Sequence, residues 1–262
     1  MNTLIFFIIS FAASCLGAIF GIGGGVIIKP VLDSLQIMDV SAISFLSGCT
    51  VLSMSCYSVL KSFAAKEKDV ELHVGSFLAI GAVLGGIIGK NLFSKLYELA
   101  ANKDYVGGYQ GILLAFVTLM TFFYEYQRNK WKTHTYNHFL VCILVGFLLG
   151  MMSSFLGIGG GPMNLVVLHY FFSMDSKKAA QNSLYIILIS QLASFLTMWF
   201  SGSIPSVNPI WLAVMIFGGI SGGIVGRRVK KRISSEQLGR KFLLIILGIF
   251  ALSVFNAVKY FL

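Results

Sequence analysis

Two glycine-rich stretches constrain this chain more than any other feature of its sequence. Each holds four glycines in five residues and follows a long apolar run: Gly21-Ile22-Gly23-Gly24-Gly25 and Gly157-Ile158-Gly159-Gly160-Gly161. Because Gly is the weakest helix former after Pro, neither stretch is expected to continue the helix before it. Unpaired backbone is tolerated at membrane depth only inside protein or along a water-filled cavity. Each stretch is therefore predicted to be a helix break that lines a cavity with free N–H groups.

The rest of the chain has the composition of a membrane protein. Of its 262 residues, 56% are hydrophobic and 11% are charged, whereas soluble domains carry about 25% charged residues. The net charge of +10 fits basic cytoplasmic loops, so a lipid bilayer is the expected partner and nucleic acid is not. We predict an all-α polytopic protein of the plasma membrane. It would have about eight transmembrane segments: 3–20, 40–60, 73–92, 108–125, 138–156, 179–200, 208–226 and 240–262.

The sequence indicates two homologous four-helix repeats, 1–126 and 138–262, joined by a polar linker over 127–137. The apolar runs after the glycine stretches are too short to cross a membrane alone, and they predict half-helices over Val26–Val31 and Pro162–Met174. Parallel repeats and inverted repeats with re-entrant glycine hairpins both remain open, because either arrangement obeys the positive-inside rule. Three sets of matches indicate the duplication: the two glycine stretches, 136 residues apart; Ser44, Ser55 and Ser58 with Ser183, Ser194 and Thr197, 139 apart; and Gly81, Gly85, Gly86 and Gly89 with Gly218, Gly222, Gly223 and Gly226, 137 apart.

The candidate site is an anion site formed by the two breaks. A helix that begins after a break presents free N–H donors and the positive end of its dipole, and both suit an oxyanion. Serine hydroxyls and amides at the start of the following helices would complete the coordination. The predicted substrate-binding residues are Gly21, Gly23, Gly24, Gly25, Lys29, Ser44, Gly157, Gly159, Gly160, Gly161, Asn164, Asn182 and Ser183.

Several of these residues also have a purely structural interpretation. Close helix packing is the alternative for the glycines of the breaks, and it is the expected role of the ladders Gly81–Gly85–Gly89 and Gly218–Gly222–Gly226. Single serines often make only interhelical hydrogen bonds. Lys29 lies four residues after Gly25, where anion binding and snorkelling to the interface are both open.

The sequence contains no pattern typical of an enzyme. Paired carboxylates, a nucleophile–base pair and metal-ligand spacing are all missing from it, so we expect no catalytic residue, no metal and no cofactor. His169 could titrate in a proton-coupled cycle, although a lone histidine is more often satisfied and inert. The cysteines, all within apolar runs, are interpreted as small hydrophobic residues. They are Cys15, Cys49, Cys56 and Cys142.

The sequence resembles the TauE/SafE family of membrane permeases, also called the 4-toluene sulfonate uptake permease family. The resemblance covers the whole chain. It implies a plasma-membrane transporter built by duplication of a four-helix unit, commonly for sulfite, sulfonates or other sulfur-containing organic anions. It rests on Gly17-Ala-Ile-Phe-Gly21-Ile-Gly23-Gly24-Gly25 with Pro30, Ser154-Phe-Leu-Gly157-Ile-Gly159-Gly160-Gly161-Pro162, Ala180-Gln-Asn-Ser183-Leu184 and Gly222-Gly-Ile-Val-Gly226-Arg227.

The function expected from these patterns is secondary transport of a small anion, with a sulfur oxyanion or organosulfonate such as sulfite as the candidate substrate. The chain has no nucleotide-binding motif, so transport would be driven by a coupling ion, H⁺ or Na⁺, or by the gradient of the substrate itself. Two alternatives stay open: a passive anion channel, and a membrane-embedded partner protein that transports nothing. The sequence does not decide the substrate, the direction of transport, the coupling ion or whether the chain forms a homo-oligomer.

Overall fold

The computed structural model describes residues 2–65, 70–100 and 103–261. Over these ranges the chain is helical and has no strand, so the predicted all-α fold is confirmed. Ten α-helices and one short 3-10 helix follow one another along the chain: α1 (Asn2–Phe20), α2 (Gly25–Leu35), α3 (Val40–Ala64), α4 (Leu72–Leu99), α5 (Lys103–Tyr126), η1 (Arg128–Lys130), α6 (Phe139–Leu156), α7 (Pro162–Phe172), α8 (Ser176–Phe200), α9 (Pro209–Arg232) and α10 (Ser235–Phe261).

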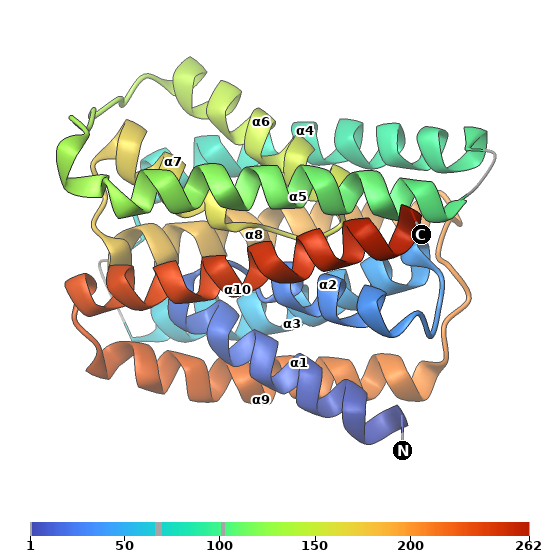
Figure 1. Cartoon of the computed structure of the whole chain (residues 1–262). Coiled ribbons are helices and arrows are strands. Elements are labelled where there is room, and N and C mark those ends of the chain that lie inside the picture. The colour runs from blue at the N-terminus through green and yellow to red at the C-terminus, as the bar shows by residue number, and fades with distance from the viewer. Residues whose placement is uncertain (1, 66–69, 101–102, 262) are drawn as a thin grey trace.

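Eight of these helices are long and apolar enough to cross a membrane, as the sequence predicts. The other two, α2 and α7, have 11 residues each and directly follow the glycine stretches. They are the two expected half-helices, although α2 extends four residues beyond the predicted end at Val31. In Figure 1 most of the helices lie side by side along one common direction, which we take as the direction in which the bundle crosses the bilayer.

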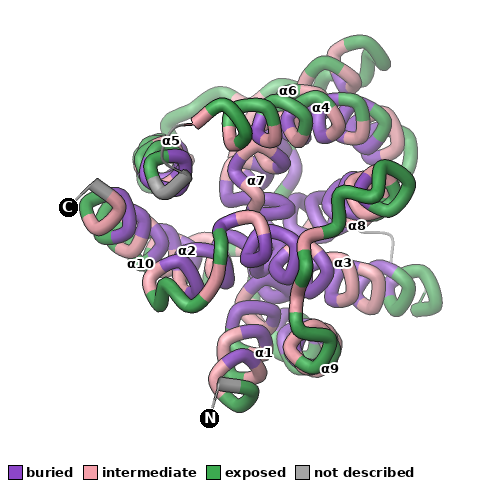
Figure 2. The backbone as a smooth tube through the Cα atoms, turned by 90° about the vertical axis from the view of Figure 1, so that its right-hand side faces the viewer, coloured by how far each residue is buried: buried purple, intermediate pink, exposed green. Residues whose placement is uncertain are grey.

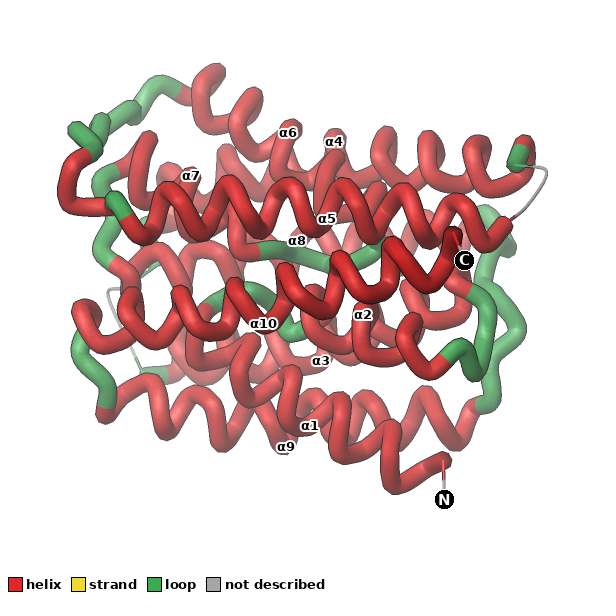
Figure 3. Tube along the Cα trace, viewed as in Figure 1, coloured by secondary structure: helices red, strands yellow, loops and turns green. Residues whose placement is uncertain are grey.

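The glycine stretches form tight reversals inside the bundle. Figure 3 shows the turns between α1 and α2 and between α6 and α7 as short loop segments in the middle of the bundle, away from both of its ends. L-residues rarely adopt positive φ, and this explains why the sequence uses glycine here. Positive φ occurs at Gly21 (74°), Gly23 (82°), Gly24 (70°), Gly157 (66°), Gly159 (67°) and Gly160 (143°).

The two halves of the chain run in opposite directions. The start of α3 and the ends of α4 and α10 meet in one small apolar cluster that contains Val40, Phe93 and Tyr260. At the other end of the bundle, Arg128 after α5 donates a hydrogen bond to Ser176 at the start of α8. Because α3 and α8 therefore begin at opposite ends, the helix directions fit inverted halves with re-entrant hairpins (Figure 1). Common ancestry of the halves stays a prediction.

Basic residues gather at the end where α8 and α10 begin, which we call the basic end; the opposite end is called the outer end. By the positive-inside rule the basic end faces the cytoplasm. The outer end holds the end of α2, since Lys259 near the end of α10 donates to the carbonyl of Ser34 over 2.8 Å. The basic end carries Arg128, Lys177, Lys178, Arg232, Arg240 and Lys241.

Glycine ladders lock each half onto the other, which confirms their predicted packing role. A Cβ on Gly85 of α4 would collide with the carbonyl of Phe147 in α6, and one on Gly222 of α9 would collide with that of Phe11 in α1. Helices that approach this closely need small residues at the contact. The view along the bundle in Figure 2 places α2, α3, α7 and α8 at the centre, where most of the chain is buried.

Candidate functional site

A cavity of about 40 Å³ lies beside the second break and extends along α3, α4 and α8 toward the outer end. The polar side chains of its lining include Lys90. The apolar ones include Phe45, Phe195 and Met198. No carboxylate of the described chain lines it. The lining residues are Ser44, Phe45, Gly48, Cys49, Lys90, Ser153, Ser154, Gly157, Gly159, Gln191, Ser194, Phe195 and Met198.

The second break has a backbone N–H without an acceptor at a residue that lines this cavity. The N–H of Gly157 is used within the turn, where it donates to Ser154 over 3.2 Å. The N–H of Gly159 has no acceptor among the described residues, and Gly159 itself lines the cavity. The side-chain amide of Gln191 packs against Gly159: a Cβ added to Gly159 would lie 3.1 Å from Gln191 Cδ. Buried donors of this kind are normally satisfied, so the site calls for an acceptor.

Lys29 is buried behind the cavity and does not snorkel. Its side chain is only 3% exposed, and its Nζ donates to Ser44 Oγ over 3.3 Å and to Gln110 Oε1 over 2.5 Å. Gln110 Nε2 in turn donates to the carbonyl of Phe155 over 2.5 Å, which ties α5 to the end of α6. Ser44 lines the cavity and Lys29 does not, so Lys29 is one hydrogen bond away from the cavity lining.

Asn164 and Ser183 lie at the first break, on the other side of the centre. Ser183 Oγ donates to the carbonyl of Gly21 over 2.6 Å, and Asn164 Nδ2 donates to Ser183 Oγ over 3.2 Å. These bonds hold α7 and α8 against the first break. They match the interhelical role that the sequence left open for single serines.

The two breaks touch each other at the centre of the bundle. A Cβ on Gly25 would collide with the carbonyl of Ile158, and one on Gly23 would lie 3.6 Å from the carbonyl of Gly159. The N–H of Gly25 already donates to Gly23 over 2.8 Å. A Cβ on Gly160 would lie 3.6 Å from the carbonyl of Ile22, whereas one on Gly24 would meet Ala13 of α1 and one on Gly161 would meet Ile158 of its own break. The structure therefore brings the predicted glycines together, but only Gly157 and Gly159 reach the cavity.

Asn182 is the one predicted residue that the structure does not bring to this centre. Its Oδ1 accepts from the N–H of Glu71 over 2.9 Å, and its Nδ2 donates to the carbonyl of Lys178 over 2.9 Å. It therefore fastens the start of α4 to α8. Ser44 and Ser183, which the sequence comparison pairs, do not occupy equivalent positions in their helices. Ser44 is the fifth residue of α3, whereas Ser183 is the eighth residue of α8.

Sequence reasoning missed most of the polar residues of the cavity wall. Lys90 directly follows the ladder Gly81–Gly85–Gly89, whose expected role is helix packing, and its spacing indicates no site. Gln191, and Gln110 behind the cavity, could have been found, because an amide inside an apolar helix is costly and points to a specific partner or site. The other missed residues are Ser153, Ser154 and Ser194.

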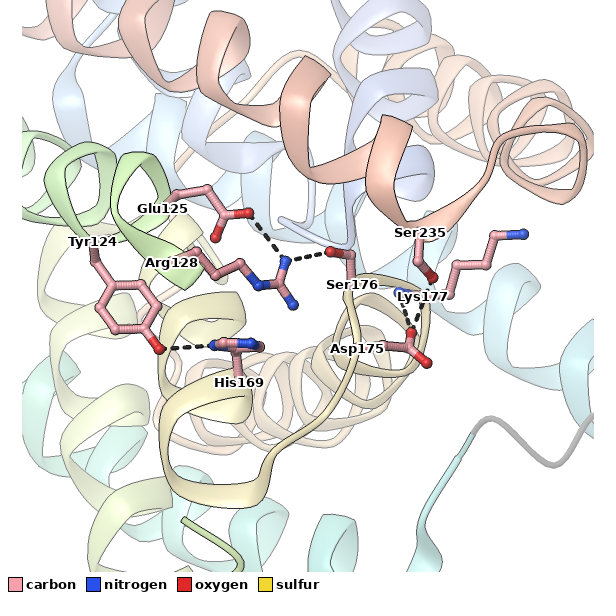
Figure 4. Close-up of polar contacts among 8 residues, drawn as sticks. All are labelled: Tyr124, Glu125, Arg128, His169, Asp175, Ser176, Lys177 and Ser235. Carbon is pink, nitrogen blue, oxygen red and sulfur yellow. Dashed lines mark hydrogen bonds and ion pairs between the residues drawn. The ribbon is translucent and has the colours of Figure 1, made fainter. Parts of the chain in front are cut away.

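A second polar cluster lies at the basic end, on the far side of the breaks (Figure 4). Arg128 joins Glu125, at 3.1 Å, to Ser176 at the start of α8. Tyr124 Oη lies 2.8 Å from His169 Nδ1, which gives the lone histidine a partner. The cluster joins α5, α7 and α8 at this end.

Asp175 joins the starts of α8 and α10 in the same region. Burial alone would raise the pKa of Asp175, but hydrogen bonds from the amides of Lys178 and Lys177 and from Ser235 lower that pKa on balance. The carboxylate is therefore held ionised as the N-cap of α8, where the helix dipole also favours negative charge.

Comparison with known proteins places this geometry in a family. The family model described as "Sulfite exporter TauE/SafE" matches residues 6–254. The chain belongs to the TauE/SafE family of membrane transporters. It is 24% identical over 273 residues to "Probable membrane transporter protein YunE" of Bacillus subtilis, covering 95% of this chain and 96% of that protein. It is also 24% identical over 256 residues to "Probable membrane transporter protein MJ0441" of Methanocaldococcus jannaschii, covering 94% of this chain and 92% of that protein. No solved structure matches.

The family and the eight apolar helices together indicate a multi-pass membrane transporter, as the sequence predicts. A lipid bilayer and a small substrate follow as partners. Within the described residues no cluster of three or more His, Cys, Asp or Glu could hold a metal ion.

Proposed function

We propose that this TauE/SafE transporter carries a small sulfur oxyanion or organosulfonate, with sulfite as the first candidate, as a secondary transporter. The observation that carries the proposal is the chemistry of the cavity at the second break. It is lined by Lys90, by four serines and by Gly159, whose N–H has no acceptor among the described residues, and no described carboxylate lines it. Donors in a water-poor site bind an anion more strongly than the same donors in bulk water.

The mixed lining of the cavity fits a sulfonate as well as sulfite. Its polar residues would hold the sulfur oxygens, with Lys90 as the charge and Gly159 as a backbone donor. Phe45, Phe195 and Met198 leave apolar contacts for a short organic group. Helix breaks that meet at mid-depth between inverted halves are the arrangement through which many secondary transporters bind their substrates.

Counterflow in proteoliposomes tests this proposal. Vesicles with the purified protein are loaded with unlabelled sulfite, thiosulfate or methanesulfonate, and the transient accumulation of the labelled anion is measured. We expect saturable counterflow of at least one of the three anions. Unitary currents without counterflow would support a passive channel instead, and no movement of any of them would refute the proposal.

A matched pair of variants connects the assay to the cavity. Lys90→Met removes the charge from the cavity wall and should raise the apparent KM for the anion at least tenfold. Lys95→Met makes the same change on an exposed residue of α4 outside the cavity, and it should leave the KM unchanged. Equal KM values in the two variants would remove Lys90 from the site.

A further inference from the structure

A second, smaller cavity lies behind Ser44, between α2, α5 and α10. Its volume is about 10 Å³, close to the smallest space that holds one water molecule. Lys29 and Asp33 of α2 line it together with Gln110 of α5 and Asn256 of α10. All of these side chains are buried, and Asp33 is only 7% exposed. An ionisable residue inside a membrane protein is a functional candidate by default.

Two oxygens of this cavity lack a hydrogen-bond donor. Gln110 uses its carbonyl oxygen for Lys29 and its amide for Phe155. Asn256 Nδ2 donates to the carbonyl of Pro30 over 2.6 Å. Asp33 Oδ1 and Asn256 Oδ1 remain, and neither has a partner among the described residues. Because unpaired buried acceptors are costly, a hydrogen shared between these two oxygens would stabilise the site.

We propose that Asp33 binds the proton that this transporter moves together with its anion. The proposal rests on the proposed function, which it extends by naming the coupling ion and its site. The proton comes from water and adds to Asp33 Oδ1, so that the carboxylate becomes a neutral carboxylic acid. Its new O–H donates to Asn256 Oδ1, directly or through one water, and satisfies both oxygens. Release breaks only this O–H bond.

Lys29 connects the proton site to the anion site. It lines the small cavity with Asp33, and its Nζ donates to Ser44, which lines the anion cavity. An anion beside Ser44 draws the charge of Lys29 toward itself. Asp33 then loses part of the positive charge that stabilises its carboxylate, and it takes up a proton more readily. The anion and the proton therefore favour each other's binding, and their charges cancel.

The charges around Asp33 favour a proton over a sodium ion. The ammonium groups that face this region are Lys29 from α2, Lys90 from α4 and Lys259 from α10, which donates to Ser34 one residue beyond Asp33. The described part of α5 contributes only neutral residues to the cavity, and α3 contributes Ser44 behind it. A sodium ion would be a separate cation among three ammonium groups with only two unpaired side-chain oxygens as ligands.

The experiment measures proton movement directly. Proteoliposomes that contain a trapped pH-sensitive dye receive the anion that counterflow shows to be carried, in a sodium-free buffer. In the wild type we expect the vesicle interior to become more acidic as the anion enters. A proton gradient directed inward, with the outside more acidic than the inside, should raise anion accumulation at least tenfold. Protein-free vesicles given the same anion correct for protons that the anion itself carries.

Three variants locate the proton. Asp33→Asn keeps the shape of the side chain but cannot take up a proton, so it should lose the tenfold effect of the pH gradient. Asp33→Glu restores a carboxyl group and should recover the effect. Asp39→Asn changes an exposed carboxylate that precedes α3, outside both cavities, and should behave as wild type.

Each result bears on one proposal. Counterflow without acidification in the wild type, or accumulation that follows Na⁺ instead, overturns the proton site and leaves the proposed function intact. Accumulation driven by the pH gradient in Asp33→Asn overturns the assignment to Asp33. If the wild type shows no counterflow with sulfite, thiosulfate or methanesulfonate, the proposed function fails and the proton site fails with it. If Asp33→Asn does not fold, the wild-type measurement still decides whether a proton moves with the anion, and Asp33→Glu tests the position: a folded Asp33→Glu without the effect of the gradient overturns the assignment to Asp33.

Discussion

Gly159→Ala, compared with a matched control, tests whether the second break shapes the anion cavity or only needs glycine for its backbone conformation. Gly159 has φ of 67°, a region that costs an L-residue about 1–2 kcal/mol. The new Cβ would also lie 3.1 Å from Gln191 Cδ, closer than ordinary carbon contacts, so the Gln191 amide must move and the cavity wall with it. The expected loss of stability is thus small, whereas the site is reshaped where the anion should bind.

Gly202 supplies the matched control. Its φ is 64°, and a Cβ there would meet nothing within 4 Å. Gly202→Ala therefore has the same backbone cost without any displaced neighbour. We expect the free energy of unfolding of both variants to fall by about 1–2 kcal/mol, and both should melt a few degrees lower than the wild type. Only Gly159→Ala should lose sulfite counterflow, by at least tenfold. If the two variants transport equally well per folded molecule, the role given to the second break is refuted.

Two further predictions concern stability. Gly85→Ala should lower the melting temperature in detergent more strongly than it lowers counterflow, because its Cβ collides with the Phe147 carbonyl and pushes α4 away from α6. Gly248→Ala is the control. Gly248 is exposed and a Cβ there would meet nothing within 4 Å, so this variant should keep the melting temperature of the wild type. Asp175→Ala should destabilise the protein by about 0.5–2 kcal/mol at pH 7, since it removes the N-cap of α8. Because the folded-state pKa of Asp175 is lowered below its ordinary value of 3.8, the stabilisation is complete above that value and disappears as the pH falls through the folded-state pKa. The difference in melting temperature between wild type and variant should shrink over that range, and a difference independent of pH would contradict this reasoning.

The general architecture could be predicted because each of its signals is local. Apolar segments near the length of a bilayer span predict the long helices, and consecutive glycines predict a break wherever they occur. The short runs after the breaks could be assigned to half-helices for the same reason. The glycine ladders were also correctly assigned, since spacing of four residues places small side chains on one helix face.

The cavity wall could not be predicted in the same way, because it depends on which helices meet. Lys90 and Gln191 come from α4 and α8, which belong to different halves of the chain. A single sequence contains no signal that pairs them. Asn182 is the opposite case, a residue wrongly predicted to belong to the site. Its neighbour Ser183 faces the centre, while its own side chain faces the start of α4. On a helix, adjacent residues point in directions about 100° apart, so adjacency to a site residue is poor evidence of a shared site.

The way the halves interlock leads to a last prediction, about a chain cut in its linker. In the structure α4 of the first half packs along α6 of the second, and α9 of the second packs along α1 of the first. The linker adds contacts at the basic end, where Arg128 bonds Ser176 and where His134 and Tyr136 donate backbone hydrogen bonds to the end of α7.

A protease site inserted between Lys132 and Thr133 should therefore be cut without separating the halves. Residues 131 and 132 are exposed at the basic end, so cleavage should occur only from the side that the positive-inside rule identifies as cytoplasmic. The two fragments should then copurify in mild detergent and retain sulfite counterflow. Fragments that separate would show that the interlocked contacts are too weak to hold the halves together. Cleavage from the opposite side of the membrane would show that the orientation inferred from the basic residues is reversed.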